Sequence, residues 1–148
     1  MRGMLVVVLA LVPAVALAQA VKRANPPALS TPTGYTHVVE VTGPAKTVYV
    51  AGQIALDKSG NLVGGSDMKA QAEQVFKNLE AALAAAGATF KNVVKMNMYT
   101  TDISQVQAIR DVRSRYLTSD LPASTLVQVV RLARPDLLLE IEVVAAVP

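Results

Sequence analysis

The strongest constraint on the fold is an amphipathic segment over residues 66–86. Its apolar residues recur at intervals of three and four, the spacing that places them on one face of an α-helix. Ser66 is a favourable N-cap, Asp67 suits the first turn, and Gly87 supplies a C-terminal stop. The segment therefore predicts a long helix with one buried face. The residues of that face are Met68, Ala72, Val75, Phe76, Leu79, Ala82, Leu83 and Ala86.

Short runs of β-branched or alternating residues on both sides of this helix predict strands. Only the residues Thr42 to Ala45 separate the first two runs, which predicts that they form a hairpin. In the third run Val94, Met96 and Met98 share one face, as in a half-buried strand. The predicted strands cover residues 37–41, 46–50, 92–100, 125–132 and 137–147.

A second, shorter helix is predicted from Ser104 to about residue 117. Ser104 and Gln107 form a capping-box pattern at its start, and Leu121-Pro122 follows its end. Two helices among five or six strands predict an α+β fold, with both helices on one face of a mixed sheet. Nothing else in the domain is available to cover the opposite face, so we expect the chain to oligomerise through it.

The first twenty residues have the three-part layout of a secretory signal peptide. Arg2 precedes an apolar run, and two small-x-small sites then allow cleavage after Ala18 or after Ala20. The apolar run is too short to cross the hydrocarbon core of a bilayer. We therefore expect a secreted or periplasmic protein with no membrane attachment after cleavage. The expected division is a signal peptide at residues 1–20, an extended leader without regular structure at residues 21–33, and a single domain at residues 34–148.

Composition limits the chemistry that this domain can perform. An apolar fraction of 52% against 17% charged residues supports a packed core. The chain has no Cys and one His, which excludes thiol nucleophiles, disulfides and multi-histidine metal sites; we interpret His37 as structural. The formal net charge of +3 comes from scattered Lys and Arg residues, so we expect no nucleic-acid partner. We also expect no metal and no cofactor.

A set of short motifs, in order along nearly the whole predicted mature chain, resembles the Rid family, the reactive intermediate deaminases. Each motif is a weak signal alone, and the ordered set is specific. The motifs are Gly34-Tyr35, Val48 to Ile54, Gln71 to Leu79, Leu83 to Ala88, Val93 to Met96, Tyr99 to Asp102, Pro122-Ala123, Val127 to Val129, and Glu140 to Glu142.

The resemblance implies a chorismate-mutase-like α+β fold. It also implies a homotrimer whose sheets form a central barrel, with clefts at the subunit interfaces. Enzymes of the family hydrolyse 2-imino acids to 2-keto acids and ammonia without a cofactor. By position, the resemblance places the cleft tyrosine at Tyr35, a glycine that faces the ligand at Gly52, and the water-directing carboxylate at Glu140.

One position departs from the family pattern. Where the family has Pro-Ala-Arg-Ser, this chain has Pro122-Ala123-Ser124-Thr125, so Ser124 stands in place of the carboxylate-binding arginine. A hydroxyl cannot form the bidentate ion pair, and we expect at least about a 10²-fold loss with ordinary imino acids. Arg110 is the candidate replacement cation, with a solvated helix residue as the alternative.

Alternatives remain for the other candidates. Tyr35 could pack beneath the leader, and Gly52 could mark a β-bulge. Glu142 lies on the same strand face as Glu140, and only the family register prefers Glu140.

The expected partner is a small imine, carbonyl or carboxylate compound, besides further copies of the chain. The leading hypothesis is an imine deaminase with an altered substrate range. The alternatives are a non-catalytic binding or protective trimer and a ribonuclease. The ribonuclease would need a general base pair and a phosphate-binding patch that the sequence does not supply.

Overall fold

A computed structural model describes residues 19–148, and the expected signal peptide lies outside the described residues except for Gln19 and Ala20. The main sheet has the strand order β3-β6-β4-β5, and β1 and β2 form a separate two-stranded sheet. The strands are β1 (Ala20–Ala24), β2 (Val38–Thr42), β3 (Lys46–Gln53), β4 (Val93–Thr100), β5 (Ala123–Gln128) and β6 (Leu139–Val147). The helices are α1 (Met68–Ala85) and α2 (Val106–Tyr116), with short 3₁₀ turns η1 (Phe90–Asn92) and η2 (Ile103–Gln105).

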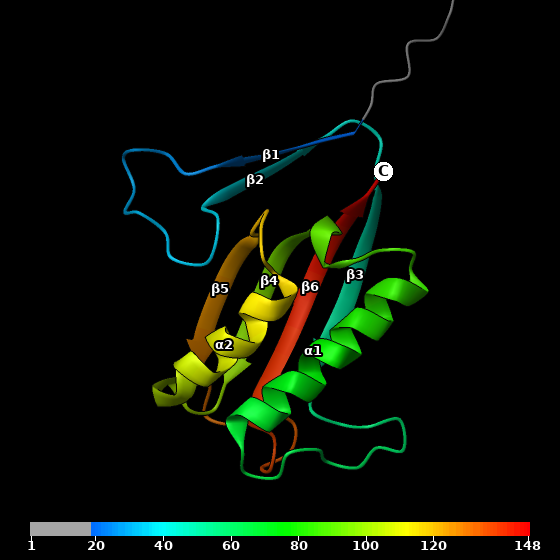
Figure 1. Cartoon of the computed structure of the whole chain (residues 1–148), viewed down its shortest axis with the longest axis vertical. Coiled ribbons are helices and arrows are strands. Elements are labelled where there is room, and N and C mark those ends of the chain that lie inside the picture. The colour runs from blue at the N-terminus through cyan, green and yellow to red at the C-terminus, as the bar shows by residue number, and fades with distance from the viewer. Residues whose placement is uncertain (1–18) are drawn as a thin grey trace, which may run out of the picture.

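Both helices lie on the same face of the four-stranded sheet (Figure 1). β4 pairs in parallel with β5 and antiparallel with β6, and β3 pairs antiparallel with β6, so the sheet is mixed. The predicted α+β fold is therefore confirmed. Its core combines the apolar face of α1, which includes Leu79, with buried residues of the central strands such as Ile141 and Val143.

The long helix begins one residue later than its sequence pattern suggested. Asp67 is the N-cap, and its carboxylate accepts hydrogen bonds from the backbone N–H groups of Lys69 and Ala70. The prediction of Ser66 as cap was therefore wrong, because a carboxylate reaches two free N–H groups here. Gly87 ends the helix with a φ of +69°, as expected for a left-handed C-terminal residue.

The predicted hairpin between the first two strand segments was wrong. Both segments are strands, but β2 pairs with β1 and β3 pairs with β6. An almost wholly apolar strand such as β6 is stable only as a central strand with partners on both edges, and β3 supplies one of those edges. The leader is also not without regular structure, because residues 21–24 of β1 lie inside it and pair with β2.

Two smaller predictions were corrected by local backbone geometry. A register shift lies between Val93 and Lys95, so Val93 rather than Val94 is fully buried beside the core methionines. Before α2, Asp102 caps the 3₁₀ turn η2, where its carboxylate accepts from the backbone N–H and the hydroxyl of Ser104. The N-cap of α2 itself is Gln105, whose side chain makes no capping hydrogen bond. The expected capping box with Gln107 therefore does not form.

The sheet face opposite the helices carries polar and exposed side chains. Tyr49 on β3 is 79% exposed, and Glu140 and Glu142 are half-buried between fully buried neighbours on β6. Among residues 19–148, no helix is long and apolar enough to cross a membrane. The sequence predicted no covering layer for this face of the sheet, and a single chain indeed leaves it uncovered.

Candidate functional site

The candidate residues fall into two groups, and the first lines a cavity of about 280 Å³ beside α2. This cavity, the α2 pocket, is lined by Tyr35, Arg110 and Ser124 together. Its remaining lining residues are Thr33, Met98, Val106, Ile109, Arg113 and Leu126.

Strand register explains why Ser124 faces this pocket. Ser124 pairs with Met96 in the parallel β4–β5 ladder, and Met96 is fully buried on the helix side of the sheet. Neighbouring residues across a ladder point to the same face, so the Ser124 side chain lies beneath α2. Arg110 is on the exposed side of α2 and still borders the cavity.

Tyr35 forms the wall of the pocket next to the leader. Its ring meets the ring of His37 edge to face, with centroids 5.2 Å apart and an interplanar angle of 82°. The His37 ring is held by a 2.8 Å contact from Nε2 to the carbonyl oxygen of Ser30. Tyr35 therefore packs against His37, which contacts Ser30 of the leader, and it also lines the cavity.

The second group is the pair Gly52 and Glu140, on β3 and β6. A Cβ atom placed on Gly52 would overlap Oε1 of Glu140 and lie 2.8 Å from its Cδ. The carboxylate thus lies directly over the Gly52 backbone, and only glycine leaves room for it. Gly52 also borders a separate cavity of about 480 Å³ beside Asn78 of α1.

The two groups lie on opposite faces of the sheet. Glu140 stands between fully buried Leu139 and Ile141 and opposite Tyr99 in the β4–β6 ladder, so it points away from the helices. Ser124 points toward them. The α2 pocket is lined by neither Gly52 nor Glu140, so the predicted site is divided within a single chain.

Glu142, the alternative carboxylate, is committed to a hydrogen-bonded network on the open face. Oε1 of Glu142 accepts from Asn97 Nδ2 at 2.8 Å and from the hydroxyl of Tyr99 at 3.1 Å. The hydrogen bond to Glu142 is the main cause of a raised pKa at Tyr99, with smaller contributions from burial and from the Glu142 and Glu140 charges. The geometry therefore separates two glutamates that sequence periodicity could not.

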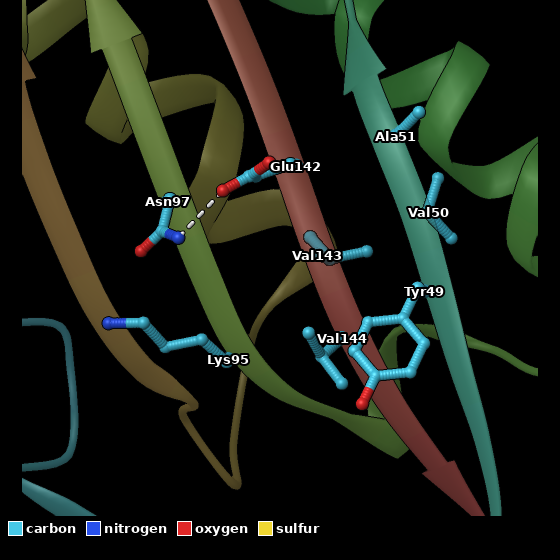
Figure 2. Close-up of a pocket in the computed structure, with 8 residues that line it drawn as sticks. All are labelled: Tyr49, Val50, Ala51, Lys95, Asn97, Glu142, Val143 and Val144. Atoms are coloured by element: carbon cyan, nitrogen blue, oxygen red, sulfur yellow. Dashed lines mark hydrogen bonds between the residues drawn. The ribbon is translucent and has the colours of Figure 1, made fainter.

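This network borders a cavity of about 340 Å³ on the open face, shown in Figure 2. The side chains of Lys95 and Asn97 on β4 lie across β6 from Tyr49 on β3 (Figure 2). No sequence motif indicated this cavity. Its only signal was the polar side of β4, where Lys95, Asn97 and Tyr99 alternate with buried residues.

Arg113 is the second feature that sequence analysis missed. It lies one helical turn beyond Arg110, and its guanidinium packs against Gly34, whose φ is +79°. A Cβ on Gly34 would overlap Arg113 Nη2, so this glycine provides the space for the arginine. The i, i+3 spacing of the two arginines on one helix was the available signal.

The α2 pocket offers hydroxyl groups and the two cations Arg110 and Arg113, and the carboxylate of Glu140 lies apart from it. Among the described residues there is no cluster of three or more His, Cys, Asp or Glu side chains that could hold a metal ion. A carboxylate can orient water, and guanidinium groups can hold an anion. The parts fit hydrolysis or binding of a small anionic molecule.

Comparisons with known proteins identify the family of the chain. The family pattern described as Endoribonuclease L-PSP matches residues 26–147. A human protein named 2-iminobutanoate/2-iminopropanoate deaminase is 38% identical over 101 residues, 68% of this chain and 72% of that protein. A deaminase of the same name from Mus musculus is 37% identical over 112 residues, 75% of this chain and 79% of that protein.

Solved structures give the same result at the level of the fold. A protein of the conserved Rid family from Yersinia pestis has a TM-score of 0.79 and 36% identity, covering 86% of this chain and 98% of that chain. RidA from an Antarctic Psychrobacter has a TM-score of 0.65 and 35% identity, covering 80% of this chain and 92% of that chain.

Proposed function

Because the chain belongs to the Endoribonuclease L-PSP family, which includes the Rid proteins, we propose that it hydrolyses small imines to carbonyl compounds and ammonia. The net reaction adds water across the C=N bond, and the nitrogen leaves as ammonia while the carbon keeps the oxygen. Relatives named 2-iminobutanoate/2-iminopropanoate deaminase support this reaction class.

The observation that carries the proposal is the placement of the Glu140 carboxylate over the backbone of Gly52. In the proposed mechanism Glu140 orients a water molecule and accepts its proton as the water attacks the imine carbon. Gly52 keeps the space beside that carboxylate open. Tyr35 shapes the opposite wall, and Ser124 and Arg110 hold the polar end of the substrate.

A second copy of the chain is needed to complete this site. The α2 pocket and the Glu140 carboxylate lie on opposite faces of one sheet, so one subunit's pocket can meet only another subunit's carboxylate. The open face, with Tyr49 79% exposed, supports assembly through that surface, and we propose a homotrimer. Light scattering on the mature protein tests the assembly, and a monomer at micromolar concentration would contradict it.

Ser124 sets the expected substrate range. A neutral hydroxyl replaces a bidentate cation at this position, so simple monocarboxylic imino acids are expected to be poor substrates. The test is ammonia release from 2-iminopropanoate generated in situ by an amino-acid oxidase, for the natural chain and for Ser124→Arg. The proposal predicts slow turnover that the substitution increases by about tenfold or more.

The alternative is a binding or protective role without turnover. The missing arginine is the one feature that favours it. No ammonia above the spontaneous rate from the natural chain or from Ser124→Arg would support this alternative and contradict hydrolysis.

We also propose that the protein is exported to the periplasm or the medium. Mass spectrometry of the exported form tests this proposal, which predicts loss of the first 18 or 20 residues.

A further inference from the structure

The α2 pocket contains two arginines whose charges have no acidic partner in the described part of the chain. The ion pairs among residues 19–148 are Arg23–Asp120, Arg115–Glu73 and Arg134–Asp136, and none involves Arg110 or Arg113. Arg115, on the same helix, is paired with Glu73 at 2.8 Å. Of these three arginines of α2, the one that does not line the cavity is paired with Glu73 of α1, and the two that line it have no acidic partner among the described residues.

Arg113 keeps its charge under unfavourable conditions. Its side chain is half-buried against Gly34. Burial is the larger cause, and repulsion from Arg110 the smaller cause, of a lowered pKa of its guanidinium. A cation placed in such a position without a counterion costs free energy. An anion bound between the two guanidinium groups would remove both the desolvation cost and the mutual repulsion.

The other lining residues contain no acidic group. They supply the hydroxyls of Thr33, Tyr35 and Ser124 and an apolar floor that includes Met98 and Ile109. The part of the pocket that one chain supplies therefore carries two positive charges and no negative one, and the Glu140 carboxylate that a second copy would bring is assigned to water and not to the arginines. A monocarboxylate would leave one charge uncompensated, whereas a dianion balances both. The volume of about 280 Å³ is near the lower limit for ligand pockets, which restricts the occupant to a small molecule.

We propose that the α2 pocket selects a small dicarboxylic compound, so that the physiological substrate is a dicarboxylic 2-imino acid. This inference rests on the proposed function for the reaction and concerns only the class of substrate. Arg110 and Arg113 share the two carboxylates, and the hydroxyl of Ser124 leaves the space that a longer side chain would fill.

Calorimetric titration of the mature protein with 2-oxoglutarate and 2-oxobutanoate tests the proposal. These are stable keto acids that differ by the second carboxylate. The natural chain is expected to bind 2-oxoglutarate about tenfold or more tightly than 2-oxobutanoate. Arg110→Gln and Arg113→Gln are each expected to abolish most of that preference. Arg131→Gln, at an exposed arginine outside the pocket, is the matched control and is expected to keep it.

Several outcomes would overturn the inference. Equal affinity for the two keto acids would do so, and so would a preference that survives both pocket substitutions. Inorganic phosphate that binds as tightly as 2-oxoglutarate would show a general anion site and would also overturn it. Arg110 is exposed, so its substitution remains informative if Arg113→Gln fails to fold.

The inference and the proposed function can fail separately. An arginine-dependent preference for 2-oxoglutarate without any ammonia release would retain the ligand class and contradict hydrolysis. Turnover of monocarboxylic imines by a protein that shows no such preference would retain hydrolysis and contradict the ligand class. Glu140→Gln is expected to stop turnover and to leave the binding preference intact.

Discussion

Gly52 on β3 and Glu140 on β6 are packed so closely that a methyl group on Gly52 would overlap the carboxylate of Glu140. The overlapping atoms are Oε1, Cδ and Cγ of one flexible side chain, so the clash can be relieved by rotation of Glu140. The absence of a side chain at Gly52 therefore leaves room for the proposed catalytic carboxylate in this position. A substitution at Gly52 can therefore show whether the position of the Glu140 carboxylate affects catalysis, separately from any effect on stability.

Gly52→Ala is expected to lower ammonia release by about tenfold or more while changing the free energy of unfolding by about 1 kcal/mol or less. The new methyl group displaces the carboxylate and leaves the core unchanged. The activity assay and a urea titration measure the two quantities. In a Glu140→Ala background the same glycine substitution has nothing to displace, so it should have no further effect on activity. Full activity of Gly52→Ala would show that the position of Glu140 is unimportant.

Gln71 is expected to be the most important buried polar side chain for stability. It is 0% exposed, and its Nε2 donates to the carbonyl oxygens of Gly65 and Asp136, while its Oε1 accepts from the N–H of Leu138. Gln71→Leu leaves these backbone groups unpaired, which costs about 1–3 kcal/mol for each buried group. A urea titration should show a loss of at least about 2 kcal/mol.

The control for this prediction is Gln107→Leu. Gln107 is an exposed glutamine on α2 that donates to Asp111, and its loss should change stability by less than about 0.5 kcal/mol. Equal effects of the two substitutions would refute the assigned role of Gln71.

The pKa of Tyr99 should report on Glu142. Because the hydrogen bond to Glu142 raises the pKa of Tyr99 above 10.0, the folded chain holds this proton more tightly than the unfolded chain does. The contribution of this proton to the free energy of unfolding is fully present below pH 10.0, and it is lost as the pH rises through the raised pKa of Tyr99. Glu142→Gln should shift the near-ultraviolet titration of Tyr99 to lower pH.

Tyr99→Phe identifies which part of that titration belongs to Tyr99. Glu140→Gln should shift it less than Glu142→Gln does, because the Glu140 charge is the smallest of the causes. A larger shift from Glu140→Gln would contradict the assigned hydrogen bond.

Acid stability should depend in part on Asp102. Hydrogen bonds from the Ser104 side chain, from Gln105 and from the Ser104 backbone lower the pKa of this carboxyl from 3.8. The contribution of Asp102 to the free energy of unfolding is therefore present above pH 3.8, and it is lost as the pH falls through the lowered pKa of this carboxyl. Asp102→Asn should melt at a lower temperature than the natural chain near neutral pH, and the difference should shrink in acid. A difference that stays constant down to about pH 2 would contradict this account.

Much of the fold follows from periodicity alone. The three- and four-residue spacing of α1 and its Gly87 stop predicted that helix to within about one turn at each end. The partner of β2 was not predictable, because a short strand carries no information about which edge it joins. β1 lies in a proline-containing leader whose composition favoured irregular structure, and its pairing depends on contacts across the fold.

The candidate site was predicted only in part, for a similar reason. Tyr35, Arg110 and Ser124 line one cavity and Gly52 meets Glu140 elsewhere, a division that the motif positions did not indicate. Period-two alternation could not separate Glu140 from Glu142, since the difference lies in the cross-strand neighbours Asn97 and Tyr99. The division of the site between two faces depends on strand register, which a single sequence does not specify.

The central claim is that Glu140, and not its neighbour Glu142, activates water for imine hydrolysis. The most direct test is the rate of ammonia release from an in situ generated 2-imino acid by Glu140→Gln and Glu142→Gln, measured beside the natural chain. The account predicts a loss of about 10²-fold or more for Glu140→Gln and a change within about threefold for Glu142→Gln. Equal rates for the natural chain and Glu140→Gln, or a greater loss from Glu142→Gln, would contradict it.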